Sequence, residues 1–161
     1  MSHPEAFQLL SFEEGFRNNI YLCPAGYPTT GFGRRVRILD YETGLEVPFP
    51  ITRATEATSL ASKAGDRHDW LSLRFPSWYP HLSPQRQAVL ISLAYQVGNE
   101  GLLKFKRMLS ALSKFDLEVA ALQYLDSDAA RQCPLRFRRG ARILRDNLEV
   151  VYAIRPLSPQ E

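Results

Sequence analysis

The sequence predicts an α+β fold, with a small antiparallel sheet near the start of the chain and helices over most of the remainder. Residues 3–14 have the pattern of a short helix, with Pro4 in its first turn and Gly15 where it ends. Over residues 20–49, glycines separate β-prone stretches such as PTTGFG, VRIL and LEVPF, as in a small meander. From Thr52 onward, apolar residues recur at three- and four-residue spacing, which is typical of helices.

The later helices are predicted from start signals and from this apolar spacing. Thr52 is suited to cap a helix, and Ser83-Pro84 opens a strongly apolar helix that is the best candidate for the core. Further helices are expected over 101–112, 115–125 and 134–152. The helix after Thr52 carries a stripe of small residues that suits close packing: Ala54, Ala57, Ala61 and Ala64.

Length and composition indicate that the 161 residues form one compact unit. The net charge of +3 suits an anionic polymer, whether nucleic acid, membrane or cell wall, without choosing among them. Two cysteines are too few for a disulfide framework, and the histidines (His3, His68 and His81) have no ligand spacing, so we expect no metal and no cofactor. No signal-peptide pattern and no run of about 18 apolar residues occurs, so we expect no targeting segment and no integral membrane segment.

The most informative stretch of the chain begins at Glu14. Eight residues separate Glu14 from Cys23, five separate Cys23 from Thr29, and Gly31-Phe32-Gly33 follows closely. This arrangement resembles the signature of the phage-type lysozymes, glycoside hydrolase family 24, in which Glu, then Asp or Cys, then Thr occur at these spacings. Two further positions match the signature: Tyr21 and Gly26.

The resemblance continues in the second half of the chain. Residues 95–98, with Gly101 and Phe105, are similar to the family's helix and turn facing the cleft. Residues 131–136 are similar to its Gln-x-Pro-x-Arg segment. Little detailed match is found over 35–49 and over 69–82.

The resemblance implies one lysozyme-like domain, residues 1–161, with an active-site cleft between two lobes. A small β lobe (15–50) would be joined by a long connecting helix (51–68) to a larger helical lobe (69–161), with helix 3–14 packed at the junction. The implied activity is that of a muramidase, which hydrolyses the β-1,4 bond between N-acetylmuramic acid and N-acetylglucosamine in bacterial peptidoglycan.

Carried over residue by residue, the family's catalytic positions are Glu14 as general acid, with Cys23 and Thr29 activating or positioning water. A glycosidic bond breaks when the leaving oxygen receives a proton, so the acid must still hold its proton near neutral pH. The helix dipole and desolvation would both favour protonated Glu14, whereas Arg136, placed nearby by the resemblance, would oppose them. The helical pattern alone does not prefer Glu14 over Glu13. The matched substrate-binding positions are Gly31, Tyr95, Gln96 and Arg136.

Cys23 is the main departure, since much of the family has Asp at this position. A thiolate can accept a proton or attack carbon, but an ordinary thiol with a pKa of about 8.5 is ionised only in part at neutral pH. Inverting and retaining outcomes therefore both stay open. The resemblance also places Cys133 across the cleft from Cys23, so a disulfide that blocks the site is an alternative to two free thiols, which we favour.

The resemblance further implies a monomeric phage endolysin, made in the host cytoplasm and acting on peptidoglycan in the periplasm. A holin or another permeabilising factor would give it access to the wall. A virion-associated lysozyme or a secreted toxin would use the same chemistry. The alternative from a different class is a non-catalytic peptidoglycan-binding or structural module, supported by the replaced Asp.

A basic segment near the C-terminal end supports one more interpretation. Six arginines within residues 131–145 would attract an anionic polymer: Arg131, Arg136, Arg138, Arg139, Arg142 and Arg145. No recognition motif for nucleic acid accompanies them, so we expect no nucleic-acid partner. For the aromatic residues Trp70, Trp78 and Tyr79, packing in the interior is favoured over stacking on sugars.

Overall fold

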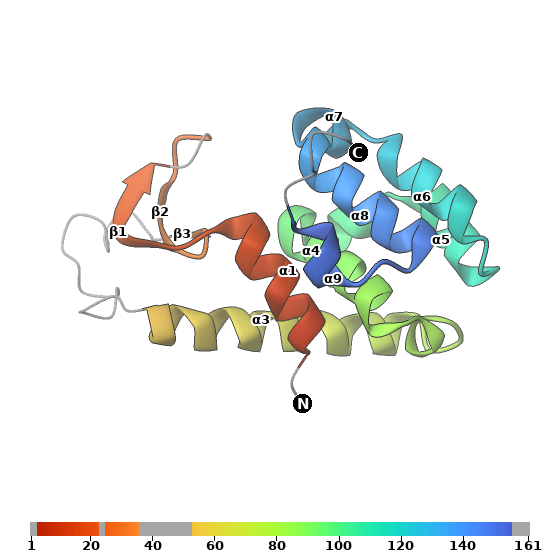
Figure 1. Ribbon diagram of the computed structural model, residues 1–161, viewed down its shortest axis with the longest axis horizontal. Coiled ribbons are helices and arrows are strands. Elements are labelled where there is room, and N and C mark those ends of the chain that lie inside the picture. The colour runs from red at the N-terminus through yellow and green to blue at the C-terminus, as the bar shows by residue number, and fades with distance from the viewer. Residues whose placement is uncertain (1–2, 23–24, 36–52, 156–161) are drawn as a thin grey trace.

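The computed structural model describes residues 3–22, 25–35 and 53–155. Over these residues the chain is mostly helical, with a three-stranded sheet at one end. Figure 1 shows the sheet apart from the group of helices that forms the larger part of the molecule, with α3 (Arg53–Arg74) running toward that group. The first helix, α1 (Pro4–Glu14), lies between the sheet and the other helices.

α1 ends at Glu14, as the sequence predicts. Gly15 follows with φ 62°, which glycine adopts without strain, and its N–H donates to the Ser11 carbonyl at 3.1 Å. The helix buries Leu9 and Leu10 and packs against α3 and α4 (Pro84–Leu103). This packing fixes the direction in which the last turn of α1 presents its carboxylates.

The sheet consists of β1 (Arg17–Leu22), β2 (Pro28–Gly31) and β3 (Arg34–Arg35), in that order and antiparallel. In the β2–β3 hairpin Thr30 lies opposite Arg34, the last pair before the turn. The three residues between them, which are Gly31 at the end of β2 and the turn residues Phe32 and Gly33, are called the 31–33 loop. Residues 23–24 and 36–50 lie outside the described residues. A complete β lobe over 15–50 therefore stays a prediction.

α3 starts directly after Thr52, the predicted cap, which lies outside the described residues, and it extends past the predicted end at residue 68. The stripe of small residues on this helix packs only in part. Ala57 and Ala64 lie against the core, whereas Ala54 and Ala61 are exposed. The stripe is not covered along its whole length because α1 crosses α3 instead of lying along it (Figure 1).

α4 is the central helix of the core, as predicted. The Ser83 hydroxyl caps it by accepting a hydrogen bond from the Arg86 N–H at 3.3 Å. Residues 88–94 are all buried, which is possible for a helix that has neighbours on several sides. α1, α3 and α8 (Pro134–Asp146) are those neighbours.

The end of α4 differs from the prediction. At Gly98 the backbone leaves helical geometry (φ 78°, ψ 165°), and the helix then resumes as far as Leu103. Gly101 therefore lies inside α4, and the next helix, α5, covers Lys106–Ser113. The prediction of one helix over 101–112 is wrong, because the break in helical geometry comes at a glycine three residues earlier.

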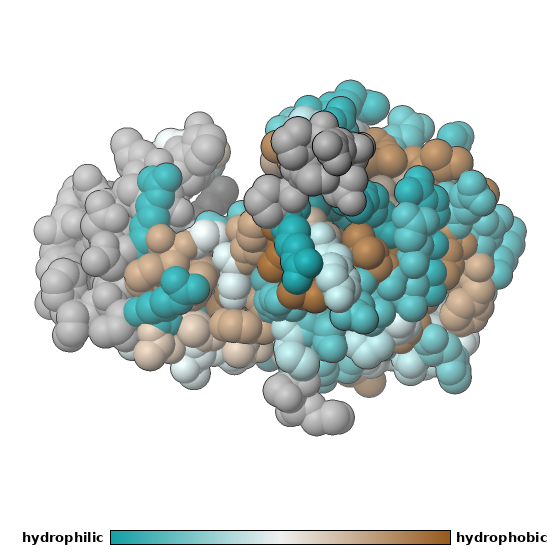
Figure 2. Space-filling model, viewed as in Figure 1, coloured by the Kyte–Doolittle hydropathy of each residue, from teal (hydrophilic) through white to brown (hydrophobic). Residues whose placement is uncertain are grey.

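Beyond α5, the described part of the chain continues with α6 (Leu117–Leu125), α7 (Asp128–Gln132), α8 and α9 (Val150–Ala153). The sequence did not predict α7. The single helix expected over 134–152 is two helices, because Asn147 takes left-handed geometry (φ 53°) and ends α8. Figure 2 shows hydrophilic residues over much of the helical part, with hydrophobic ones between them. Within the described ranges no helix is long and apolar enough to cross a membrane.

An aromatic cluster packs where α3 ends. Trp78 and Tyr79 are 5% and 0% exposed, and the rings of Phe75 and Trp78 have centroids 4.8 Å apart. Trp70 meets Phe75 edge-on at 6.2 Å. The prediction of interior packing is confirmed for Trp78 and Tyr79. Tyr79 is also the first residue of a short 3₁₀ helix (Tyr79–His81).

His68 on α3 is expected to make stability depend on pH. Its Nδ1 lies 3.0 Å from the Tyr79 hydroxyl, and its ring is 4.0 Å from the ring of His3. Burial and then the charge of His3 lower the pKa of His68 below 6.5, against the opposing effect of Asp69. The unfolded chain then takes up this proton at a higher pH than the folded protein, so the free energy of unfolding should fall as the pH drops below about 6.5.

Thermal unfolding of the wild type and of His68→Gln, measured between about pH 5 and about pH 8, tests this expectation. Above the ordinary histidine pKa, His68 is neutral in both the folded and the unfolded chain, so the difference in stability between the two proteins should not change with pH. Toward acidic pH the wild type should lose more stability than the variant. Parallel curves over the whole range would contradict the account.

Candidate active site

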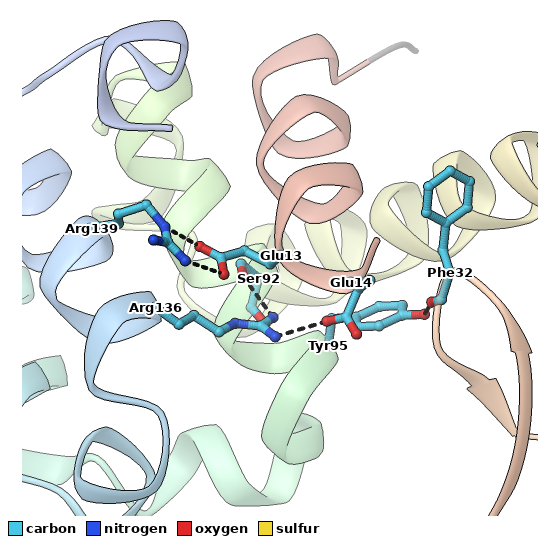
Figure 3. A network of polar contacts seen from close by, with 7 residues as sticks. All are labelled: Glu13, Glu14, Phe32, Ser92, Tyr95, Arg136 and Arg139. Atoms are coloured by element: carbon cyan, nitrogen blue, oxygen red, sulfur yellow. Dashed lines mark hydrogen bonds and ion pairs between the residues drawn. The ribbon is translucent and has the colours of Figure 1, made fainter. Parts of the chain in front are cut away.

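Two adjacent carboxylates end α1, and the structure gives them different surroundings. Glu13 accepts two hydrogen bonds from Arg139, from Nε at 2.9 Å and from Nη2 at 2.8 Å (Figure 3). Its side chain is only 4% exposed. Because both carboxylate oxygens are occupied by one guanidinium, Glu13 has the surroundings of a structural ion pair.

In Glu14, by contrast, only one carboxylate oxygen accepts a hydrogen bond from an arginine among the described residues. Arg136 Nη1 donates to Glu14 Oε1 at 2.9 Å, and the Glu14 side chain is 17% exposed. The other oxygen, Oε2, lies beside Gly33 in the 31–33 loop: a β-carbon at that glycine would be 2.8 Å from it. The structure thus separates the two carboxylates that the helical pattern could not, and it brings Glu14 together with Arg136 and the hairpin.

Arg136 is itself fixed in place by α4. Its Nη2 donates to the hydroxyl of Ser92 at 3.0 Å and to the Ser92 carbonyl at 3.3 Å. Ser92 is 3% exposed, so this contact anchors the guanidinium from inside the protein. Arg136 and Arg139 lie three residues apart on α8 and therefore share a face of the helix, which is turned to the end of α1 (Figure 3).

Tyr95 on α4 reaches toward the hairpin. Its hydroxyl donates to the Phe32 carbonyl at 3.1 Å, and Figure 3 shows the ring lying between Glu14 and Phe32. Burial raises the pKa of Tyr95 to about 12, so the hydroxyl keeps its proton at neutral pH and acts as a donor. Gln96 is the next residue on α4 and is half-buried.

Thr29 and Gly31 lie on β2, the strand that leads into the 31–33 loop. Thr29 is 3% exposed, and its hydroxyl donates to the Tyr27 carbonyl at 2.8 Å. Since the proton is used in that bond, the oxygen is left to accept a hydrogen bond from another group, such as a water molecule. Cys23 lies outside the described residues, so its role in the site stays a prediction. Cys133 carries a free, half-buried thiol.

The basic segment 131–145 offers less free positive charge than its arginines suggest. Arg136 and Arg139 are paired with the carboxylates of α1. Arg131 pairs with Asp128 at 2.9 Å, and Arg145 pairs with Asp146 at the same distance. In the part of the chain that the structure describes, no group of three or more His, Cys, Asp or Glu residues is placed to hold a metal ion.

Three residues around the site had no predicted role in it: Ser92, Arg139, which was predicted only as part of the basic segment, and Glu56. The first two carry a signal, because Ser92 precedes Tyr95 by three residues and Arg139 follows Arg136 by three, so each shares a helix face with a predicted residue. Glu56 is 3% exposed and lies against Gly31. An acidic residue in the first turn of a helix is common, so the sequence gives no sign that this one is buried.

Comparison with known proteins identifies the family of this chain. A family model described as phage lysozyme matches residues 11–140, which include Glu14, Thr29, Tyr95 and Arg136. The chain belongs to the phage lysozyme family, and a lysozyme-like fold follows from that membership. It is also 32% identical, over 162 aligned positions and 88% of its length, to the pre-baseplate central spike protein Gp5 of Enterobacteria phage T4. The chain spans 28% of the length of that relative.

The contact between Gly33 and Glu14 makes a prediction about stability. Gly33 has φ 74°, and Gly26 has φ 83° with nothing within 4 Å of an added β-carbon. Both Gly33→Ala and Gly26→Ala incur backbone strain, of about 1–2 kcal/mol. Only Gly33→Ala also pushes into Glu14; because the atom that it meets is the end of a side chain that can shift, we expect a further cost of about 1 kcal/mol.

Denaturant unfolding of both alanine variants, in the wild-type background and in Glu14→Ala, isolates this contact. The additional loss at Gly33 should shrink once the Glu14 side chain is removed, whereas the loss at Gly26 should stay unchanged. Equal losses for Gly33→Ala in the two backgrounds would show that the loop and Glu14 do not touch.

Proposed function

We propose that this chain hydrolyses the glycan strand of bacterial peptidoglycan, at the β-1,4 bond between N-acetylmuramic acid and N-acetylglucosamine. Membership of the phage lysozyme family supports this activity. The observation that carries it is the state of Glu14, whose carboxyl is anchored by Arg136 through Oε1 while Oε2 lies at the hairpin loop. Such an arrangement suits a proton donor with a fixed direction.

Glu14 acts as the general acid in this proposal. Arginine has donors and no acceptor, so a protonated Glu14 carries its proton on Oε2, the oxygen that Arg136 does not bind. That proton passes to the bridging oxygen as the bond to the anomeric carbon breaks, and water adds to this carbon. Cys23 and Thr29 activate or position the water, and the acceptor oxygen that Thr29 keeps free supports its part in this role.

The sugar chain is proposed to contact Gly31, Tyr95, Gln96 and Arg136. Support comes from their placement: Arg136 binds Glu14 directly, Tyr95 lies beside it, and Gln96 is the half-buried residue that follows Tyr95 on α4. These residues come from α4, α8 and the hairpin, so a bound strand would lie between a β lobe (15–50) and a helical lobe (69–161). α3 would join the two lobes within one domain.

In the cell, this activity fits an endolysin that reaches the wall once a holin or another factor has permeabilised the membrane. The similarity to a central spike protein favours a second setting, a lysozyme carried on the phage particle. Two measurements separate these settings. The first is lysis of bacteria that express the chain in their cytoplasm, with a membrane-permeabilising protein supplied or withheld. The second is mass spectrometry of purified phage particles, which shows whether they carry the chain. Lysis only after permeabilisation, with no chain in the particle, supports the endolysin.

Glu14→Gln is expected to abolish cell-wall digestion. The amide cannot supply the proton, so the rate of reducing-end release should fall by about 10²-fold or more. Folding should be kept, because Gln has the same shape and its carbonyl oxygen can still accept from Arg136. Measurement of released reducing ends from purified peptidoglycan, beside a thermal unfolding curve for each protein, checks both parts.

Glu13→Gln is the matched control, because it makes the same chemical change one residue away. It breaks a buried charge pair with Arg139, so stability should fall by about 1–3 kcal/mol while most activity remains below the unfolding temperature. If Glu13→Gln abolished activity and Glu14→Gln did not, the roles assigned to the two carboxylates would be reversed. A folded wild type without any wall-cleaving activity would favour the non-catalytic binding module.

Cys23 gives a separate prediction about the water. Cys23→Asp restores a group that is ionised at neutral pH and should be at least as active as the wild type, whereas Cys23→Ser should lose activity because a hydroxyl is a far weaker base. Initial rates on peptidoglycan at neutral pH decide between them. Equal rates for wild type and Cys23→Ser would remove the thiol from the mechanism and leave Thr29 as the residue that positions water.

A further inference from the structure

The 31–33 loop is touched by three different helices, one for each of its residues. Gly33 lies against Glu14 of α1, and the Phe32 carbonyl accepts a hydrogen bond from Tyr95 of α4. Gly31 lies against Glu56 of α3. The loop therefore joins the sheet to the helical part beside the oxygen of Glu14 that carries the proton in the proposed function.

Glu56 is an unusual residue to find at such a place. It is 3% exposed, and a β-carbon on Gly31 would lie 2.6 Å from its Cδ and 2.7 Å from its Cγ. Gly31 (φ 60°) thus has to be glycine, both for its backbone angle and because the Glu56 side chain fills the space of a side chain there. The buried side chain of Glu56 is therefore in direct contact with the loop and can act on its position.

Tyr95 links Glu56 to Glu14 through a shared electrostatic environment. Burial first, and then the charges of Glu14 and Glu56, raise the pKa of Tyr95, while Arg136 and Arg67 act in the opposite direction. Both carboxylates are therefore within electrostatic reach of the hydroxyl that holds the Phe32 carbonyl. The hydrogen bond, the Glu56 contact and the Glu14 contact form one connected cluster around the loop.

We propose that Glu56 and Tyr95 are positioning residues, which together seat the 31–33 loop against Glu14. Their action would set the distance between the acid and Thr29, because Thr29 lies on the strand that enters the loop. Errors of about 1 Å in such alignment cost large factors in rate, so a seated loop matters for chemistry as well as for stability. This inference rests on the proposed function for its effect on rate.

Three full-length variants test the inference: Tyr95→Phe, Glu56→Gln and the double variant. Each single change keeps the shape of the side chain and removes one hydroxyl or one charge. Initial rates on soluble, uncrosslinked peptidoglycan strands should show kcat lowered by about tenfold, because alignment fails. KM should change by less than about twofold, because the Tyr95 hydroxyl is bonded to Phe32 and Tyr95→Phe keeps the ring, which is the part left to contact the sugar. Since both residues act on one loop, the double variant should lose clearly less than the product of the single losses.

Matched controls remove the same groups at exposed positions away from the loop. Tyr152→Phe and Glu118→Gln lie on α9 and α6, and their side chains are exposed. Both should leave kcat and KM at wild-type values. Hydrogen exchange of the hairpin amides adds a readout that needs no activity: Tyr95→Phe and Glu56→Gln should speed exchange at residues 29–34, and the control variants should not.

The outcomes separate this inference from the proposed function. An active wild type whose kcat and hairpin exchange are unchanged in Tyr95→Phe and Glu56→Gln overturns the positioning role alone. Multiplicative losses in the double variant also overturn it, because the residues would then act independently. A folded wild type that releases no reducing ends, although exchange responds as expected, overturns the proposed function and leaves the loop contacts as structural.

Discussion

The clamp between the end of α1 and one face of α8 is the interaction on which the rest of the site depends. Neighbouring residues of a helix point about 100° apart, so Glu13 and Glu14 leave α1 in different directions. Arg139 and Arg136, one turn apart on α8, meet one carboxylate each. The pair at Glu13 locks the helix to the core, and the pair at Glu14 leaves one oxygen at the edge of the hairpin.

The cost of burying these charges explains why the clamp is specific. A buried carboxylate is tolerated when its partner is in place and becomes strongly unfavourable when the partner is removed. Ser92 adds a second support, because it fixes the guanidinium of Arg136 from α4. Through Arg136, the end of α1 and the start of α8 are thereby both held against α4. The packing that stabilises the helical part is thus the same packing that orients Glu14.

How much the sequence predicts depends on how local the cause is. Gly15 after Glu14 and Ser83 before α4 act over a few residues, and the helix ends that they predict are found in the structure. The break at Gly98 and the short helix α7 were not predicted, because a single glycine inside an apolar helical pattern and a helix of five residues give little periodic signal. In the site, the motif pointed to Glu14 and the resemblance to Arg136. Glu56 was missed because its burial follows from how α3 meets the hairpin.

In the proposed reaction, water adds to the sugar while Glu14 gives its proton to the leaving oxygen. Digestion of peptidoglycan in water enriched in heavy oxygen, followed by mass spectrometry of the fragments, measures this directly. We expect the wild type to leave one heavy oxygen at each new reducing end, carried by N-acetylmuramic acid, and Glu14→Gln to leave none. Fragments without heavy oxygen, such as an anhydro sugar at the new end, would contradict it.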